Sequence, residues 1–159
     1  MEQDYVQAPE LIVQKWLNSD SDISLAKLHG KVVVIFAFQM LCPGCVLNSI
    51  PQARQVNALF KDFDVTVLGL HCVFEHHDAM TEVSLKAFLH EYQITFPVGI
   101  DMPSLNPAQA MPETMSLYQM GGTPSLIMVD QQGRLRKHKM GHEQDLIVGA
   151  EIMNLVKEV

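Results

Sequence analysis

The sequence has few cysteines, three among 159 residues, which excludes a small domain held together by a framework of several disulfides. Long apolar runs are also missing, because no stretch approaches the roughly 20 residues that span a bilayer. Residues 1–5 contain neither the basic start nor the apolar core of a signal peptide. We therefore expect a cytoplasmic protein without a membrane span, or a periplasmic one if a leader has been removed.

Basic residues are scarce as well. The 11 lysines and arginines are outnumbered by 18 aspartates and glutamates, which gives a net charge of −7. Nucleic acids and anionic membranes need clustered basic residues, so neither is an expected partner. With 48% hydrophobic residues the chain can bury a proper core. It contains no repeat, low-complexity tract or linker, and we expect a single domain over residues 1–159.

An apolar run that ends in two cysteines is the central feature of the sequence. Residues 32–38 are β-branched or aromatic except for one alanine, which predicts a strand buried on both faces. The motif Cys42-Pro43-Gly44-Cys45 follows three residues later. After it the apolar residues recur at helical spacing: Val46, Ile50, Ala53, Val56 and Phe60. The cysteine pair is thus predicted where a buried strand ends and a helix begins.

This position has chemical consequences for the two thiols. The first N–H groups of a helix lack intrahelical partners and carry partial positive charge, which would stabilise a thiolate at Cys42. Pro43 suits the first helical position, because its missing N–H is not needed there. Cys45 lies one turn further and can close a disulfide with Cys42. A zinc site is the other use of this spacing, but Cys72 stands alone and supplies no second half. Thiol–disulfide exchange is therefore favoured.

The remaining segments alternate between strand and helix patterns. A short strand or hairpin is expected within residues 11–17 and one helical turn at 24–30. The pattern then predicts these elements: strand 65–71, helix 81–92, strand 96–101, short helix 112–118, strand 125–129, return strand 134–140 and a closing helix at 146–156. This order predicts an α/β fold, with a mixed central sheet and helices on both faces.

The return strand is rich in basic side chains: Arg134, Arg136, Lys137 and Lys139. Charged residues of this kind suit an exposed edge strand that must not pair with other chains. A docking strip for an acidic partner is the less favoured interpretation.

The chain from about residue 8 onward resembles the thioredoxin-like superfamily, and most closely its TlpA-like and redoxin branch. Three features account for the resemblance: the Cys-Pro-Gly-Cys motif after a buried strand, Gly122-Thr123-Pro124 before a later strand, and a hairpin at residues 129–133. An N-terminal extension and an insertion near residues 72–107, before the strand that follows Pro124, also resemble this branch. The resemblance implies a thioredoxin-like fold and an oxidoreductase activity.

The resemblance also implies roles for particular residues. Cys42 would be the exposed attacking thiol and Cys45 the buried resolving thiol. Pro124 would be a cis proline that faces the disulfide. The backbone of Thr123 would bind a substrate peptide as an added strand, and Pro43 and Gly44 would lie at the same substrate-binding surface. No cofactor or metal is implied. The expected partners are thiol- or disulfide-containing proteins and a recycling redox partner, and a monomer is expected.

The sequence departs from the family pattern at three places. Leu41 stands where many relatives have Trp before the first cysteine. Phe36 occupies the position of the buried carboxylate of thioredoxins, and Asn48 and Ser49 stand where TlpA-like proteins often have Glu. Glu75 is the candidate substitute for the missing acid. Gln39 replaces the Thr or Ser that a peroxiredoxin needs, which disfavours a peroxidase.

A soft-metal or copper-handling protein is the alternative function, since sulfur ligands select Cu(I). Cys42 and Cys45 could cluster with further sulfur and nitrogen ligands from Met40, Met120, His71, His76 and His77. The simpler interpretation makes these methionines core residues and the histidines solvated ones. Pro124 would also hinder metal entry if it covers the thiols. The sequence leaves open whether the cysteine pair reduces or oxidises its substrate.

Overall fold

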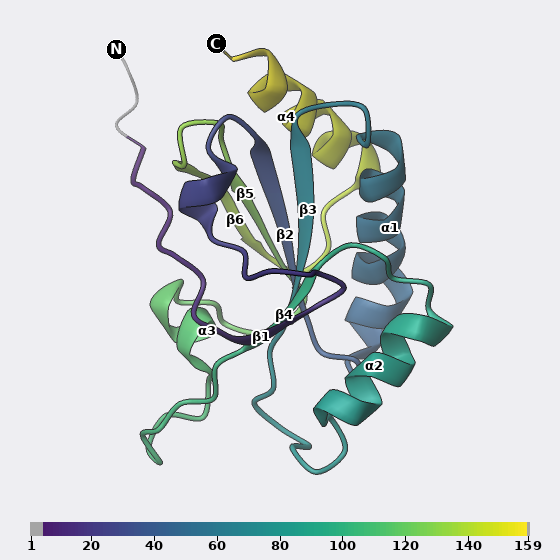
Figure 1. Ribbon diagram of the computed structural model, residues 1–159, viewed down its shortest axis with the longest axis vertical. Helices are drawn as coiled ribbons and strands as arrows, with labels where there is room; N and C mark the ends of the chain where they lie inside the picture. The colour runs from purple at the N-terminus through teal and green to yellow at the C-terminus, as the bar shows by residue number, and fades with distance from the viewer. Residues whose placement is uncertain (1–4, 159) are drawn as a thin grey trace.

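A mixed six-stranded β-sheet runs through the protein (Figure 1). The computed structural model describes residues 5–158. The strands are β1 (Val13–Leu17), β2 (Val32–Phe38), β3 (Val65–His71), β4 (Val98–Asp101), β5 (Ser125–Val129) and β6 (Leu135–Met140). Their order in the sheet is β1-β4-β3-β2-β5-β6. Strands β4, β3 and β2 are parallel to one another, and β1, β5 and β6 are antiparallel to their neighbours.

Helical segments cover both faces of this sheet. They are the 3₁₀ turn η1 (Leu25–Leu28), the π-helix η2 (Cys45–Ser49) and the α-helices α1 (Ile50–Leu59), α2 (Glu82–Glu91), α3 (Glu113–Leu117) and α4 (Asp145–Lys157). Buried residues of α1, α2 and α4 share one hydrophobic core, and those of η1 and α3 share the other. The mixed sheet with helices on both faces is confirmed.

Strand β2 lies between the two cores because its sequence is apolar at every position. Alternate residues point to opposite faces of a strand. Val34 and Phe36 accordingly belong to the core under α1, whereas Val33 and Ile35 belong to the core under α3. All seven residues of β2 are buried. The strand is therefore fixed from both sides up to the point where the chain turns toward Cys42.

The helix predicted after the cysteines has an irregular first part. Residues 45–49 form a π-helix, in which the N–H of Ile50 bonds to the carbonyl of Cys45. Pro51 gives the physical reason, since it has no N–H for the carbonyl of Leu47 and its ring would clash with that carbonyl in a regular α-helix. A wider turn before Pro51 avoids the clash. The sequence prediction of one continuous α-helix was wrong in this detail.

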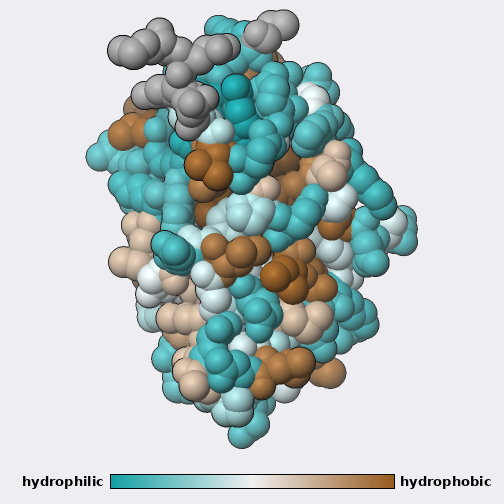
Figure 2. Space-filling model, turned by 90° about the vertical axis from the view of Figure 1, so that its left-hand side faces the viewer, coloured by the Kyte–Doolittle hydropathy of each residue, from teal (hydrophilic) through white to brown (hydrophobic). Residues whose placement is uncertain are grey.

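Other predicted boundaries are close to the observed ones. The sequence suggests Asp78 or Thr81 as the cap of helix α2. The cap is Thr81, whose Oγ1 accepts a hydrogen bond from the N–H of Ser84 at 3.3 Å. Strand β4 is shorter than predicted, with four residues. Residues 5–158 contain no helix that is long and apolar enough to cross a bilayer. On the face shown in Figure 2, hydrophobic atoms lie in separate spots among hydrophilic ones.

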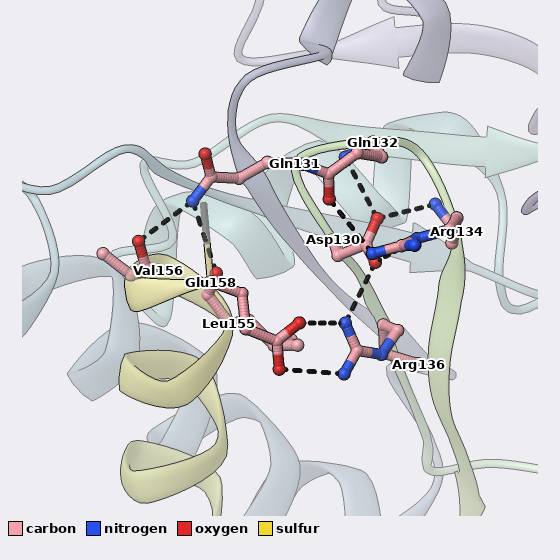
Figure 3. Close-up of polar contacts among 8 residues, drawn as sticks. All are labelled: Asp130, Gln131, Gln132, Arg134, Arg136, Leu155, Val156 and Glu158. Carbon is pink, nitrogen blue, oxygen red and sulfur yellow. Dashed lines mark hydrogen bonds and ion pairs between the residues drawn. The ribbon is translucent and has the colours of Figure 1, made fainter. Parts of the chain in front are cut away.

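The basic residues of β6 are paired within the chain, at the sheet edge where they were predicted. Asp130 accepts hydrogen bonds from Arg134 Nε at 2.8 Å and Arg136 Nη1 at 3.0 Å, and Arg136 also bonds to both carboxylate oxygens of Glu158 (Figure 3). We call these four residues the hairpin clamp, because they tie the β5–β6 hairpin to the end of α4.

The next basic residue of the strand is neutralised in the same way, since Lys137 forms ion pairs with Glu143 and Glu151. These intramolecular pairs leave little charge for the docking strip considered from the sequence.

Candidate active site

Cys42 lies between the end of β2 and the start of the helix, as predicted. Residues 43 and 44 already have helical conformation. The N–H of Cys42 bonds to the carbonyl of Gln39 at 3.1 Å, which forms a tight turn before the thiol. The N–H of Cys45 points at Cys42 Sγ with a distance of 3.4 Å. A helix N–H therefore reaches the sulfur on which negative charge develops when Cys42 ionises.

Cys45 is fully buried, whereas Cys42 is partly exposed, and both thiols are reduced. Burial, followed by the hydrogen bond with the Cys42 thiol, raises the pKa of Cys45 to about 12. Hydrogen bonds from the backbone of Gln39 and the side chain of Thr123 act in the opposite direction. One thiol is thus accessible, and the other stays protonated behind it.

Thr123 and Pro124 lie against the two cysteines. The peptide bond between them is cis. The thiol of Cys42 donates a hydrogen bond to the carbonyl of Thr123 at 3.6 Å. A Cβ atom built on Gly44 would lie 3.5 Å from Cδ of Pro124, so the loop of the motif and the proline are neighbours. Pro43 is exposed beside them.

Two exposed apolar side chains border this site. Leu41, directly before the nucleophile, is 54% exposed, and Met140 at the end of β6 is 61% exposed. Met140 lies over the backbone before Thr123, because a Cβ built on Gly121 would meet its sulfur at 3.0 Å. The N–H of Gly141 holds this end of β6 to the carbonyl of Pro124 at 2.8 Å. The accessible thiol of Cys42 therefore lies beside an apolar surface.

The sequence profile of the Redoxin family matches residues 4–151. The chain belongs to the Redoxin family. A crystal structure of a thioredoxin-like superfamily protein shares 58% sequence identity, with a TM-score of 0.92 over 97% of this chain and 98% of that one. A thiol-disulfide isomerase from Corynebacterium glutamicum shares 43% identity, with a TM-score of 0.90 over 98% and 99% of the two chains. These likenesses confirm the thioredoxin-like fold.

A more distant relative is the thiol-disulfide oxidoreductase ResA of Bacillus cereus. It is 25% identical over 122 residues, which are 76% of this chain and 61% of the relative. This Redoxin chain spans less than two thirds of the length of the curated relatives that it matches.

The acid that the sequence suggested as a substitute for a buried carboxylate near the resolving thiol is not buried. Phe36 is buried at one of the positions compared with the family pattern, and Glu75, the predicted substitute, is exposed. Asp101 at the end of β4 is a buried acid that sequence reasoning missed. Its oxygens accept hydrogen bonds from the N–H groups of Thr114 at 2.8 Å and Met115 at 3.0 Å. Burial raises the pKa of Asp101 despite these bonds.

Asp101 faces the third cysteine. Burial raises the pKa of the Cys72 thiol well above its usual value, and the charge of Asp101 adds to the effect. Cys72 is completely buried at the end of β3, as expected for a small hydrophobic residue. An acid at the end of an apolar strand was the sequence signal for Asp101. Its partners lie in a helix that the pattern did not connect to that strand.

The histidines of this Redoxin protein do not gather around the thiols. His76 and His77 are exposed, whereas His71 is buried and its Nε2 accepts a hydrogen bond from the N–H of Met40 at 3.2 Å. Met40 and Met120 are core residues. Within residues 5–158 no three side chains of His, Cys, Asp or Glu are grouped so that they could hold a metal ion. The histidines and methionines named for the copper-handling alternative are therefore exposed, hydrogen-bonded to the backbone or packed in the two cores.

Proposed function

We propose that this protein is a thiol–disulfide oxidoreductase that exchanges dithiol and disulfide through Cys42 and Cys45. The observation that supports it most directly is the pairing of a partly exposed thiol with a buried one, joined by the hydrogen bond from the N–H of Cys45 to Cys42 Sγ. The names of the similar proteins, a thiol-disulfide isomerase and a thiol-disulfide oxidoreductase, point to the same chemistry.

In the first step the Cys42 thiolate attacks one sulfur of a substrate disulfide. A new bond joins Cys42 to that sulfur, and the second substrate sulfur leaves as a thiolate. The N–H of Cys45 stabilises the attacking thiolate, since it lies 3.4 Å from the sulfur. The carbonyl of Thr123 orients the thiol before it ionises.

In the second step Cys45 attacks Cys42 Sγ. The Cys42–Cys45 disulfide forms, the remaining substrate sulfur leaves, and the proton of Cys45 ends on that leaving sulfur. Because burial keeps Cys45 protonated, it is protected from solvent oxidants until the mixed disulfide exists. The two electrons lost by the pair have then passed to the substrate. A dithiol partner restores the reduced pair, and the reverse sequence oxidises a substrate dithiol.

The substrates we propose are proteins or small molecules that contain a thiol or disulfide. Leu41 and Met140 suit an apolar residue beside the substrate cysteine, and the backbone of Thr123 suits an extended peptide. No cofactor is part of the proposal. A monomer suffices, because one chain supplies both thiols and the Thr123–Pro124 segment. We also retain the cytoplasmic location as a proposal.

Three variants test the proposed function on a fluorescent peptide disulfide. Cys42→Ser should abolish turnover, because serine cannot form the mixed disulfide. Cys45→Ser should accumulate a covalent adduct of one peptide on Cys42, measured by mass spectrometry. Cys72→Ala is the matched control and should keep its activity. Full activity in Cys42→Ser would contradict the mechanism.

The reduction potential of the pair, measured in glutathione buffers, tests the location and the direction of electron flow. A potential of about −270 mV would fit a reductase of the cytoplasm, whereas about −120 mV would mark an oxidant and contradict the cytoplasmic proposal.

A further inference from the structure

The main-chain ladder between β2 and β3 ends just before the thiols. The last paired residues are Phe38 and His71, and one more backbone bond follows, from the N–H of Cys72 to the carbonyl of Phe38 at 2.9 Å. Beyond this point β2 turns away toward Cys42. The next inward-facing N–H belongs to Met40, a residue that is only 7% exposed. A buried N–H at this place needs a partner, and the backbone of β3 no longer supplies one.

The ring of His71 supplies that partner. Its Nε2 accepts the hydrogen bond from Met40 at 3.2 Å, so a side chain continues the ladder by one step. The ring is 1% exposed and packs against Phe38 with 5.2 Å between ring centroids. A nitrogen that accepts carries no proton, so the proton of the neutral ring is on Nδ1. Burial favours this neutral form and lowers the pKa of His71 to about 4.

We propose that His71 is a positioning residue, whose ring fixes the turn that presents Cys42 to the N–H of Cys45. This inference rests on the proposed function, and it assigns a role to a residue that does not touch the thiols. The turn comprises residues 39–42 and is closed by the bond from the N–H of Cys42 to the carbonyl of Gln39. The Met40 N–H lies inside that turn. Anchoring it therefore restrains the backbone on the approach to the nucleophile.

The electronic effect follows from the geometry of Cys42. The hydrogen bond from Cys45 stabilises the thiolate only while Sγ stays near that N–H. If the turn loosens, this bond is made less often, and the thiolate and hence the reduced form lose stability. The pair should then become slower to attack and more reducing.

Two substitutions separate the acceptor from the bulk of the ring. His71→Gln keeps a side-chain oxygen that can accept from Met40 and does not titrate. His71→Leu keeps an apolar side chain but leaves the N–H unpaired. Leu155→Ala, in α4 near the hairpin clamp, is the control for lost stability alone. The readouts are the alkylation rate of Cys42 by iodoacetamide, followed by mass spectrometry, and the reduction potential of the pair.

We expect His71→Leu to slow alkylation of Cys42 about tenfold, the size of effect that follows when the hydrogen bond from Cys45 to the charged sulfur is made much less often. Its reduction potential should be more negative than that of the wild type. His71→Gln and Leu155→Ala should match the wild type in both measurements. Wild-type behaviour of His71→Leu, equal impairment of His71→Gln, or equal impairment of Leu155→Ala would each overturn the inference.

A measurement on the wild-type protein covers the case in which His71→Leu does not fold. Nitrogen-15 spectra of the imidazole should show His71 with its proton on Nδ1 and a bare Nε2 at pH 7. A proton on Nε2 would overturn the inference, because that nitrogen could not accept from Met40. If the wild type forms no Cys42–Cys45 disulfide at any glutathione ratio, the proposed function fails. The spectra and the alkylation rates would still report on His71.

Discussion

The two ends of strands β2 and β5 bury polar groups in opposite ways. At one end burial keeps Cys45 and His71 in their neutral forms, and the hydrogen bonds of this end go largely to the backbone. At the other end β5 runs into the hairpin clamp, where Asp130 is 2% exposed and bound to two arginines (Figure 3). A buried neutral group needs only a hydrogen-bond partner, whereas a buried charge needs an opposite charge as well.

Because of this difference, the groups that stabilise the hairpin are not the ones that set the reactivity of Cys42. The charges of the clamp lie away from the thiols, so they can fasten the hairpin to α4 without changing the thiolate of Cys42. Burial pushes the pKa of Asp130 upward, but hydrogen bonds from the backbone and side chain of Arg134 and from Arg136 outweigh it, so that the pKa lies below its usual value. The thiol end in turn uses an uncharged ring, which adds no net charge to the site.

The largest expected effect comes from removing the buried charge of the clamp. Asp130→Ala leaves Arg134 and Arg136 without their shared carboxylate and should cost about 3 kcal/mol of unfolding free energy in urea melts. The alkylation rate of Cys42 should stay at the wild-type value. Glu82→Gln is the control, since its pairs with Lys15 and Lys86 are solvent-exposed and weak. Slower alkylation of Cys42 in folded Asp130→Ala would contradict the inference that the clamp does not affect the thiol.

A pH titration of stability should give the next largest effect. The pKa of His71 is about 4 in the folded protein, against 6.5 for an ordinary histidine. Above pH 6.5 the ring of His71 is neutral in both the folded and the unfolded protein. As the pH falls from 6.5 to 4, the unfolded chain binds a proton that the folded one refuses, so stability declines over this window by up to about 3 kcal/mol and then levels off. The free energy of unfolding at pH 7, 5.5 and 4 measures this decline.

His71→Gln sharpens that measurement because glutamine does not titrate. The free energy of unfolding of the wild type minus that of the variant should fall by up to about 3 kcal/mol as the pH is lowered from 7 to 4. Acidic groups contribute equally to both proteins and cancel. A constant difference over this range would show that the folded ring takes up its proton at the same pH as the unfolded one, which would contradict a ring kept neutral by burial.

The smallest expected effect concerns the neutral part of the hairpin. Gln131 donates from Nε2 to the carbonyls of Leu155 at 3.3 Å and Val156 at 3.0 Å, near the end of α4 (Figure 3). Gln131→Ala removes both bonds and should cost about 1 kcal/mol. Gln132→Ala is the neighbouring control, because Asp130 binds its backbone N–H and its side chain makes one exposed hydrogen bond, from Arg134 Nη2 at 3.3 Å. A loss for Gln131→Ala as large as that for Asp130→Ala would show that charge is not what distinguishes the clamp.

Local patterns predicted much of the fold. An unbroken apolar run gave β2, the pattern of residues 65–71 gave β3 with its observed bounds, and Thr81 was one of two residues read as a helix cap. The motif placed Cys42 and Cys45 at the junction of strand and helix. These features depend on neighbours in the sequence, which is why they can be read from it. The π-helix was also readable, since Pro51 is incompatible with a regular helix at that place.

The missed residues depend on contacts between distant segments. His71 was read as the end of a strand or as a metal ligand, because nothing local shows that its ring meets Met40, 31 residues away. Asp101 was read as a strand end for the same reason, since its partners belong to α3. Glu75 was considered as the missing acid because it follows β3, but its side chain is exposed.

The pairing of β1 with β4 has a consequence for how the chain is made. Val13 lies opposite Asp101, so β1 leaves the ribosome well before the strand that pairs with it. Segments emerge in order from the N-terminus, and β2 and β3 can join each other much earlier. During synthesis β1 therefore remains unpaired, while the part of the sheet that leads to Cys42 begins to assemble without it.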